Sequence, residues 1–294
     1  MSGRSPGRYK LIAIDMDGTL LSIRGEVTPR TKAAIHRCLS AGILICFATG
    51  RNWTESQVVL DAVEHYDSAV FVGGAMVVDT KQRVMLHRVL MDAALASEVS
   101  ELLESAGHAV MAAQDPASGH EYVVTGEVEL QESMKQWLSH TQATVRIVPR
   151  LSSFDHAHTI RLSVIARLDS LDDVQRAIDE RFGDRVFYHR MAIPHKNVEL
   201  MELFDPSVNK WEGILHVARK HDVLPEEIIA IGDDFNDLHM IRHAGLGVAM
   251  GNARPEVQRL AKRVIGTNEE EGLARFLEEL VDQHEVQAAN VSAT

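Results

Sequence analysis

The sequence has few cysteines, few aromatic residues and no long apolar run, and the first and last of these shortages each exclude a class of protein. Two cysteines among 294 residues, Cys38 and Cys46, cannot build a disulfide framework, so we expect folding in a reducing compartment. No stretch approaches the roughly 18 apolar residues of a membrane-spanning helix. The first apolar segment soon reaches Asp15 and Asp17, unlike that of a signal peptide. These features predict a cytoplasmic protein.

Positive charge is also scarce. Thirty Lys and Arg residues face 42 Asp and Glu residues, a net charge of -12 with histidine neutral. Broad binding to nucleic acid or to an anionic membrane needs clustered positive charge, so we expect neither as a partner, and no obligate protein partner is evident. With 45% hydrophobic and 24% charged residues, the composition is typical of a folded globular protein. A small anionic substrate would need local cations or a metal ion to hold it.

Strand and helix signals alternate near both ends of the chain. Short apolar runs predict strands that are buried on both faces, at residues 11–14, 43–48, 69–72, 228–231, 246–250 and 264–265. Helical patterns separate them, at residues 29–41, 53–64, 207–221, 238–243, 255–262 and 272–281. This alternation predicts an α/β fold with a doubly wound parallel sheet.

The middle of the chain has a different pattern. Helical signals at 93–105, 128–140 and 171–182 alternate with strand-like runs at 122–125, 159–165 and 186–189. Helices flanked by several strands of this kind suggest an α+β domain inserted into the doubly wound one. We therefore predict a core domain of residues 1–82 and 196–294, and an inserted domain of residues 83–195.

Two aspartates follow the first predicted strand directly, in the segment LIAIDMDGTL. Open parallel sheets bind their ligands outside the carboxyl ends of the strands. Residues two apart on an extended chain point to the same side, so Asp15 and Asp17 can converge on one site. Carboxylates this close repel each other unless a cation lies between them or one is protonated. The pattern favours a cation-dependent site over a solvated turn.

This segment resembles the first motif of the haloacid dehalogenase superfamily, whose members mostly transfer phosphoryl groups through an aspartate nucleophile. Three later segments resemble the other motifs of that family. They are ICFATGR at 45–51, NKWEG at 209–213 and IGDDFND at 231–237. All four occur in order and in the expected strand or helix context. The resemblance implies a doubly wound core like that of the superfamily.

The resemblance also implies the chemistry of the acidic residues. Asp15 would attack phosphorus and form an aspartyl phosphate. Asp17 would protonate the leaving oxygen and then activate water against that intermediate. Mg²⁺, which prefers oxygen ligands, would be held by Asp15, Asp233 and the main-chain carbonyl of Asp17.

Further residues of these motifs would bind the substrate. By resemblance they are Gly18, Thr49, Gly50, Lys210 and Asn236. Lys210 would neutralise charge on the phosphate and on Asp15, which matters because electrostatics dominates phosphoryl transfer. Asp237, together with Asn236, would orient Lys210 and the waters of the metal.

The inserted domain lies between the second and third motifs, which resembles the type II cap of the Cof-type phosphatases. The segment GVAMGNA at 247–253 is also similar to that group. Two departures are Gly73-Gly74-Ala75 in place of the usual Asn-Gly-Ala, and the lack of a Pro-Lys-Gly segment before Lys210. The resemblance implies small phosphorylated metabolites as substrates, with sugar phosphates ahead of nucleotides and pyridoxal phosphate. Arg161, His195 and Lys196 are candidate contacts to the leaving group.

Two alternatives stay open at this point. A phosphomutase would return the phosphoryl group from Asp15 to a sugar, but relatives of that kind usually carry a smaller cap between the first and second motifs. A receiver-like module, controlled by phosphorylation, is also doubly wound and has an acidic pocket. Such a module needs neither an equivalent of Asp17 nor an inserted domain.

Overall fold

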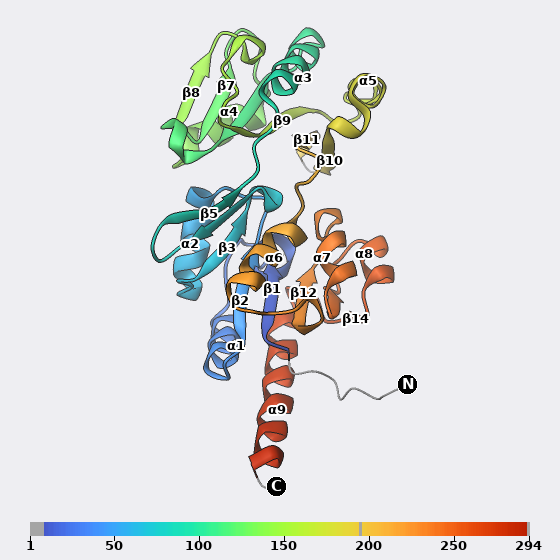
Figure 1. Cartoon of the computed structure of the whole chain (residues 1–294). Helices are drawn as coiled ribbons and strands as arrows, with labels where there is room; N and C mark the ends of the chain where they lie inside the picture. Colours follow the sequence, from blue (N-terminus) through green and yellow to red (C-terminus); the bar gives the residue numbers. More distant parts are fainter. Residues whose placement is uncertain (1–8, 194–195, 293–294) are drawn as a thin grey trace. The chain divides into compact units, whose positions relative to one another are not determined.

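Residues 9–193 and 196–292 are described by the structure, a computed structural model, and they divide into two units (Figure 1). The second unit is Arg88–Val208, and the chain on either side of it forms the first. Within the described residues, no helix combines the length and apolarity needed to cross a membrane.

The first unit is built on an eight-stranded sheet in the order β14-β13-β12-β1-β2-β3-β4-β5. Its strands are β1 (Leu11–Asp15), β2 (Leu44–Ala48), β3 (Ser68–Phe71), β4 (Met76–Asp79), β5 (Val84–Arg88), β12 (Ile228–Gly232), β13 (Leu246–Ala249) and β14 (Arg263–Val264). From β14 to β3 the strands are parallel, which confirms the predicted doubly wound sheet. β4 runs antiparallel to β3, so the sheet as a whole is mixed. A short turn at Val72–Gly74 reverses the chain between them.

The helices of this unit form two groups. They are α1 (Pro29–Ser40), α2 (Trp53–Val63), α6 (Lys210–Lys220), α7 (Leu238–His243), α8 (Pro255–Leu260) and α9 (Gly272–Ser292). α1 packs against α2 and α9, whereas α7 packs against α6 and α8. The chain winds outward from β1 in two opposite directions, and right-handed crossovers then place the two groups on opposite faces of the sheet. Helix α9 extends beyond the predicted end at residue 281.

Local sequence explains where these helices begin. Thr28 accepts a hydrogen bond from the Thr31 N–H (3.1 Å) and precedes Pro29, the first residue of α1. Asn52 caps α2 in the same way by accepting from the Glu55 N–H (2.7 Å), and Asn209 caps α6. Every residue of β1 and β12 is buried, as the unbroken apolar runs predict.

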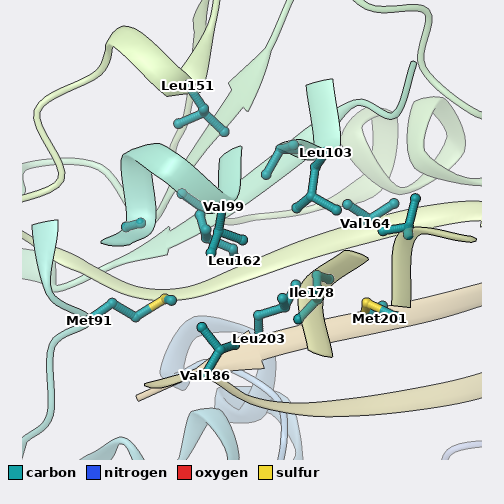
Figure 2. Close-up of a cluster of buried hydrophobic side chains, with 14 of the residues drawn as sticks. Met91, Val99, Leu103, Leu151, Leu162, Val164, Ile178, Val186, Met201 and Leu203 are labelled. Atoms are coloured by element: carbon teal, nitrogen blue, oxygen red, sulfur yellow. The ribbon is translucent and has the colours of Figure 1, made fainter. Parts of the chain in front are cut away.

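The second unit contains a six-stranded sheet in the order β10-β11-β9-β6-β7-β8. The strands are β6 (Val110–Gln114), β7 (Tyr122–Thr125), β8 (Val145–Val148), β9 (Thr159–Arg167), β10 (Phe187–Ile193) and β11 (Val198–Phe204), and the helices are α3 (Ala93–Ser105), α4 (Glu132–His140) and α5 (Asp172–Phe182). Side chains of α3, α5 and one sheet face form a large buried cluster that includes Val99, Ile178 and Leu203 (Figure 2). A smaller cluster lies around Tyr122 of β7 and Met134 of α4. This unit is the α+β domain that the sequence predicts.

The units divide at positions that differ from the predicted domain boundaries. The chain enters the second unit after His87 rather than after residue 82, and leaves it after Val208 rather than after residue 195. The larger difference arises because β11 pairs with β9 and β10, and so belongs to the second sheet. Charged residues such as Glu199 interrupt its apolar pattern. The Glu199 carboxylate accepts hydrogen bonds from the Leu171 N–H (2.8 Å) and from Arg190 Nε (2.9 Å), which allows it to be buried.

Candidate active site

The predicted site residues come together where β1, β2 and β12 end. Asp15 is the last residue of β1, Thr49 follows β2, and Asp233 follows β12. These strands are neighbours and run parallel, so their carboxyl ends lie at one edge of the sheet (Figure 1). β1 is also the strand from which the chain winds in two directions, which is where such sheets bind ligands.

A wide turn follows the proposed nucleophile. Residues Met16–Leu20 form it, and the Leu21 N–H closes it by donating to the Met16 carbonyl (2.9 Å). Gly18 has φ +81°, and a Cβ there would lie 2.3 Å from Asp233 Oδ2. Thr19 Oγ1 donates to Asp233 Oδ1 (3.1 Å). Glycine therefore allows the turn to lie directly against the Asp233 carboxylate.

Lys210 lies at the centre of the site. It is the first residue of α6, its side chain is fully buried, and its Nζ donates to Asp15 Oδ1 (2.5 Å) and Asp237 Oδ1 (2.7 Å). Burial alone lowers the pKa of Lys210, but the charges of Asp15 and Asp237 outweigh it and raise that pKa above its ordinary value. The ammonium group therefore stays charged beside Asp15.

The turn between β3 and β4 helps to position Lys210. Gly74 has φ +112°, and a Cβ there would lie only 2.0 Å from the carbonyl oxygen of Asn209, the N-cap of α6. Glycine at this position lets the turn lie against the start of the helix. The Gly73-Gly74-Ala75 segment, a departure from the family pattern, thus retains the glycine that the contact requires.

Asp237 links Lys210 to the loop after β12. Its Oδ2 accepts from the N–H groups of Asp233 (2.9 Å) and Asp234 (3.1 Å), while Oδ1 accepts from Lys210. The Asp237 side chain is fully buried. These contacts would allow Asp237 to orient Lys210, and that role stays a prediction from the family resemblance. The neighbouring Asn236 amide lies about 4.0 Å from where a Cβ of Gly50 would be, so these two proposed substrate-binding residues are close together.

Three carboxylates of the site lie close enough to share a cation. Ligand atoms of Asp15, Asp233 and Asp237 all lie within 4.8 Å of one another. Burial, together with the neighbouring carboxylates, raises the pKa of Asp15 well above its usual range and that of Asp233 to about 7. One ammonium group faces the three carboxylates, so a divalent cation would balance the remaining charge. Oxygen donors of this kind fit Mg²⁺.

The side chain of Asp17 does not join this cluster. It pairs with Arg51, a residue for which the sequence predicts no role. Arg51 Nε and Nη2 donate to Asp17 Oδ2 (2.8 Å) and Oδ1 (2.5 Å). The hydrogen bonds that Arg51 donates to the Asp17 carboxylate raise the pKa of Arg51. The Arg51 N–H donates to Thr49 Oγ1 (3.1 Å), so the second motif holds this arginine in place. Arg51 is the last residue of the ICFATGR segment, and this position is the feature of the sequence that could have identified it.

Two of the three candidate contacts to the leaving group, Arg161 and Lys196, lie among the described residues. Arg161 lies in the second unit, where Nη1 pairs with Glu202 Oε1 (2.6 Å) and the guanidinium lies 6.0 Å from the centre of the Phe204 ring. Lys196 is exposed, and His195 lies outside the described residues. Their contact with a leaving group stays a prediction.

Comparison with known proteins places this chain in a family. A model of the haloacid dehalogenase-like hydrolases matches residues 12–277. A 5-amino-6-(5-phospho-D-ribitylamino)uracil phosphatase from Bacillus subtilis is 28% identical over 271 residues, which cover 92% of this chain and 96% of the relative. An HMP-PP phosphatase from Yersinia enterocolitica is 26% identical over 277 residues, covering 92% and 94%.

Solved structures agree in fold. A haloacid dehalogenase-like hydrolase from Bacteroides thetaiotaomicron has a TM-score of 0.78 at 22% identity, covering 93% of this chain and all of that one. A sugar phosphatase of subclass IIB of the same superfamily has a TM-score of 0.75 at 20% identity, covering 92% and 98%. The chain therefore belongs to the haloacid dehalogenase-like hydrolases, and it is an enzyme of the phosphatase type.

Proposed function

We propose that this enzyme is a Mg²⁺-dependent phosphatase that hydrolyses small phosphorylated metabolites through an aspartyl phosphate on Asp15. The observation that carries the proposal is a set of four charged side chains at the ends of β1 and β12: Asp15, Lys210 and Asp237 are buried, and Asp233 is half-buried. Its carboxylates exceed its one ammonium group, and a site that leaves charged groups uncompensated is poised for a cation and a reacting anion.

In the first step, an oxygen of Asp15 attacks phosphorus and the bond between phosphorus and the leaving oxygen breaks. Asp17 donates its proton to that oxygen, so the alcohol leaves neutral and Asp17 is left as a carboxylate. Lys210, 2.5 Å from Asp15, stabilises charge on the nucleophile and on the phosphoryl oxygens. Gly18, Thr49, Gly50 and Asn236 would hold those oxygens.

In the second step, the Asp17 carboxylate takes a proton from water, whose oxygen attacks the phosphorus of the aspartyl phosphate. The bond between phosphorus and Asp15 breaks, which releases inorganic phosphate and restores the free carboxylate. In this structure Arg51 donates hydrogen bonds to both oxygens of the Asp17 carboxylate, so this pair must open before Asp17 can carry a proton to the leaving oxygen. Mg²⁺, held by Asp15, Asp233 and the main-chain carbonyl of Asp17, would supply positive charge to the phosphoryl oxygens.

The substrate class follows from the relatives and the family resemblance. By their names, one relative acts on a phosphorylated ribitylaminouracil and another on HMP-PP. A related structure of subclass IIB is a sugar phosphatase. These names support small phosphorylated metabolites in general, and the resemblance of the inserted domain to a Cof-type cap favours sugar phosphates. We further propose that residues 88–208 act as that cap and select the leaving group.

A panel of phosphorylated metabolites, incubated with the protein and Mg²⁺, tests the proposal through release of inorganic phosphate. We expect multiple turnovers with p-nitrophenyl phosphate and with at least one sugar phosphate. Transfer of the phosphoryl group to a second hydroxyl, without phosphate release, would indicate a phosphomutase. Stoichiometric labelling of Asp15 without turnover would indicate a receiver-like module.

A further inference from the structure

A platform made by two segments of the C-terminal region lies against the turn that follows Asp15. The platform consists of residues 250–254, which follow β13, and residues 265–269, which follow β14. The Gly251 N–H donates to the Gly266 carbonyl (3.1 Å), and a Cβ at Gly251 would lie 2.9 Å from the Ile265 oxygen. The two segments are therefore in close backbone contact.

This platform is hydrogen-bonded to the last residue of β12 and to Asp233, which follows it. The Met250 N–H donates to the Gly232 carbonyl (3.1 Å), and the Arg254 N–H donates to the carbonyl of Asp233 itself (2.9 Å). These two hydrogen bonds therefore fix the platform relative to Asp233, the proposed metal ligand.

Two amide side chains connect the platform to the turn. Asn252 Nδ2 donates to the Gly18 carbonyl (2.8 Å), and Asn252 Oδ1 accepts from the Asn268 N–H (3.0 Å). Asn268 Nδ2 in turn donates to the Leu21 carbonyl (2.8 Å). The NH₂ groups of both side chains thus donate to carbonyls of the turn, and the Asn252 side-chain oxygen accepts from a backbone N–H of the platform.

The contact from Asn252 determines the orientation of one peptide group. The Gly18–Thr19 peptide bond is trans, as is every peptide bond among the described residues, so the Gly18 carbonyl and the Thr19 N–H point in opposite directions. A carbonyl held by Asn252 therefore directs the Thr19 N–H to the other side of the turn. Asp233 also contacts this part of the turn, because its carboxylate lies where a Cβ of Gly18 would be and accepts from Thr19 Oγ1. The Gly18–Thr19 segment is therefore held by Asn252 through a carbonyl and by Asp233 through a hydroxyl.

We propose that Asn252 and Asn268 are positioning residues for phosphoryl transfer, which fix the backbone of the turn after the nucleophile in the geometry that receives the phosphoryl group. Asn252 sets the Gly18–Thr19 peptide and Asn268 ties down the end of the turn at Leu21. The inference rests on the proposed function, because it assigns the turn a role in binding phosphate.

The chain offers a matched control for this proposal. Gln258 Nε2 donates to the carbonyls of Gly251 and Ala253 (3.0 Å each), so it stabilises the same platform without touching the turn. Asn252 is exposed, and an exposed hydrogen bond contributes only modestly to stability. Loss of the Asn252 amide should therefore appear in phosphate binding and turnover more than in thermal stability.

The experiment compares Asn252→Ala, Asn252→Asp, Asn268→Ala and Gln258→Ala with the full-length wild-type protein at saturating Mg²⁺. Measured are kcat and KM for p-nitrophenyl phosphate, the inhibition constant of inorganic phosphate, and the rise in Tm that inorganic phosphate produces. We expect Asn252→Ala to lower kcat/KM and weaken phosphate binding by about 10-fold, the lower end of what outer partners of a metal site contribute. Asn252→Asp should do at least as much, Asn268→Ala less, and Gln258→Ala under about 2-fold.

Two results would overturn the proposal. One is an Asn252→Ala protein whose kinetics and phosphate-induced rise in Tm both stay within about 2-fold of wild type, since a positioning role requires the larger loss. The other is a Gln258→Ala protein as impaired as Asn252→Ala, which would assign the effect to the platform's stability alone. If the wild-type protein failed to turn over any phosphate ester, the proposed function would fail. The difference in phosphate-induced Tm between wild type and Asn252→Ala would still decide the present inference.

Discussion

Both units of the molecule bury carboxylates, but they treat the buried charge in opposite ways. In the second unit, the Glu104 carboxylate accepts from Thr125 Oγ1 (2.7 Å), the Leu151 N–H (2.6 Å), Arg150 Nε (3.1 Å) and the N–H and hydroxyl groups of Ser152. Burial by itself raises the pKa of Glu104, but these hydrogen bonds outweigh it and lower that pKa. In the first unit, burial and like charges raise the pKa of Asp15.

The difference shows what separates a structural charge from a reactive one. Glu104 has donors enough for its ionised form, so its charge joins α3 to the segment that follows β8. Among the described residues, Asp15 has one close side-chain donor, Lys210, and two competing carboxylates, Asp233 and Asp237. A carboxylate left with uncompensated charge around it favours partners that bring a cation or take up its electrons, as a metal ion and a phosphorus atom do.

The largest expected effect comes from removing the reactive carboxylate. Asp15→Asn keeps the shape of the side chain but removes the nucleophile, so turnover of p-nitrophenyl phosphate should fall by about three orders of magnitude or more. The Tm should change little, because Lys210 keeps its bond to Asp237. Steady-state kinetics on folded protein checks this, and a variant with a tenth of wild-type activity would show that Asp15 is not the nucleophile.

Removal of the second unit tests whether the two units also differ in function, with chemistry in the first unit and substrate selection in the second. Residues 88–208 would be replaced by a short linker that joins residues 87 and 209, and folding would be verified by circular dichroism. We expect selectivity among natural phosphate esters to fall by about 100-fold, because contacts to the leaving group are lost, while p-nitrophenyl phosphate is still hydrolysed. Unchanged selectivity among sugar phosphates would show that this unit is not the specificity element.

A smaller effect is expected when one ligand of the proposed metal site is replaced, with chelation of the metal as the reference for complete loss. Chelation should abolish activity and Mg²⁺ should restore it, and Asp233→Asn should raise the Mg²⁺ concentration for half-maximal activity by about 10-fold or more. Titration of activity with Mg²⁺ after exhaustive dialysis measures this. Full activity in protein with no detectable metal would contradict the proposed mechanism.

Replacement of the structural carboxylate, Glu104, should lower stability and leave turnover unchanged, the opposite of the result expected for Asp15. Glu104→Gln replaces an acceptor oxygen by an NH₂ group that faces donors, so the free energy of unfolding should drop by about 1–3 kcal/mol. Urea unfolding measures this loss, and turnover of p-nitrophenyl phosphate per folded molecule should stay the same. A catalytic defect without a loss of stability would reverse the roles assigned to the two carboxylates.

The smallest expected effect concerns pH. His156 is buried, its Nε2 lies 2.8 Å from the Leu151 carbonyl, and burial lowers its pKa below the ordinary value near 6.5. Because the unfolded chain binds the proton more tightly, the stability that neutral His156 contributes is complete above pH 6.5 and is lost as the pH falls through the lowered value. The difference in unfolding free energy between wild type and His156→Gln should therefore shrink from pH 7.5 to pH 5. A constant difference would show that His156 does not titrate with folding.

Local pattern predicts the doubly wound part of the fold well. Strand β1 reads as an apolar run because it is buried on both faces, and the motif residues after β1, β2 and β12 could be assigned to one sheet edge because parallel strands share it. β11 was not predicted, because Glu199 and Glu202 break its apolar pattern. Their burial depends on partners such as Arg190 and Arg161, whose position the local sequence does not reveal.

The sequence by itself determined the order of the motifs, the residue types of the site and hence its chemistry, since strand and helix signals act over a few residues. Only the tertiary structure decided that Asp17 faces Arg51, that Asp237 joins Lys210 to the Asp233 loop, and that Asn252 holds the Gly18 carbonyl. Gly18 and Asn252 are 234 residues apart in the chain. A contact of this kind leaves no periodicity in the sequence, because it exists only once β1, β12 and β13 have paired into one sheet.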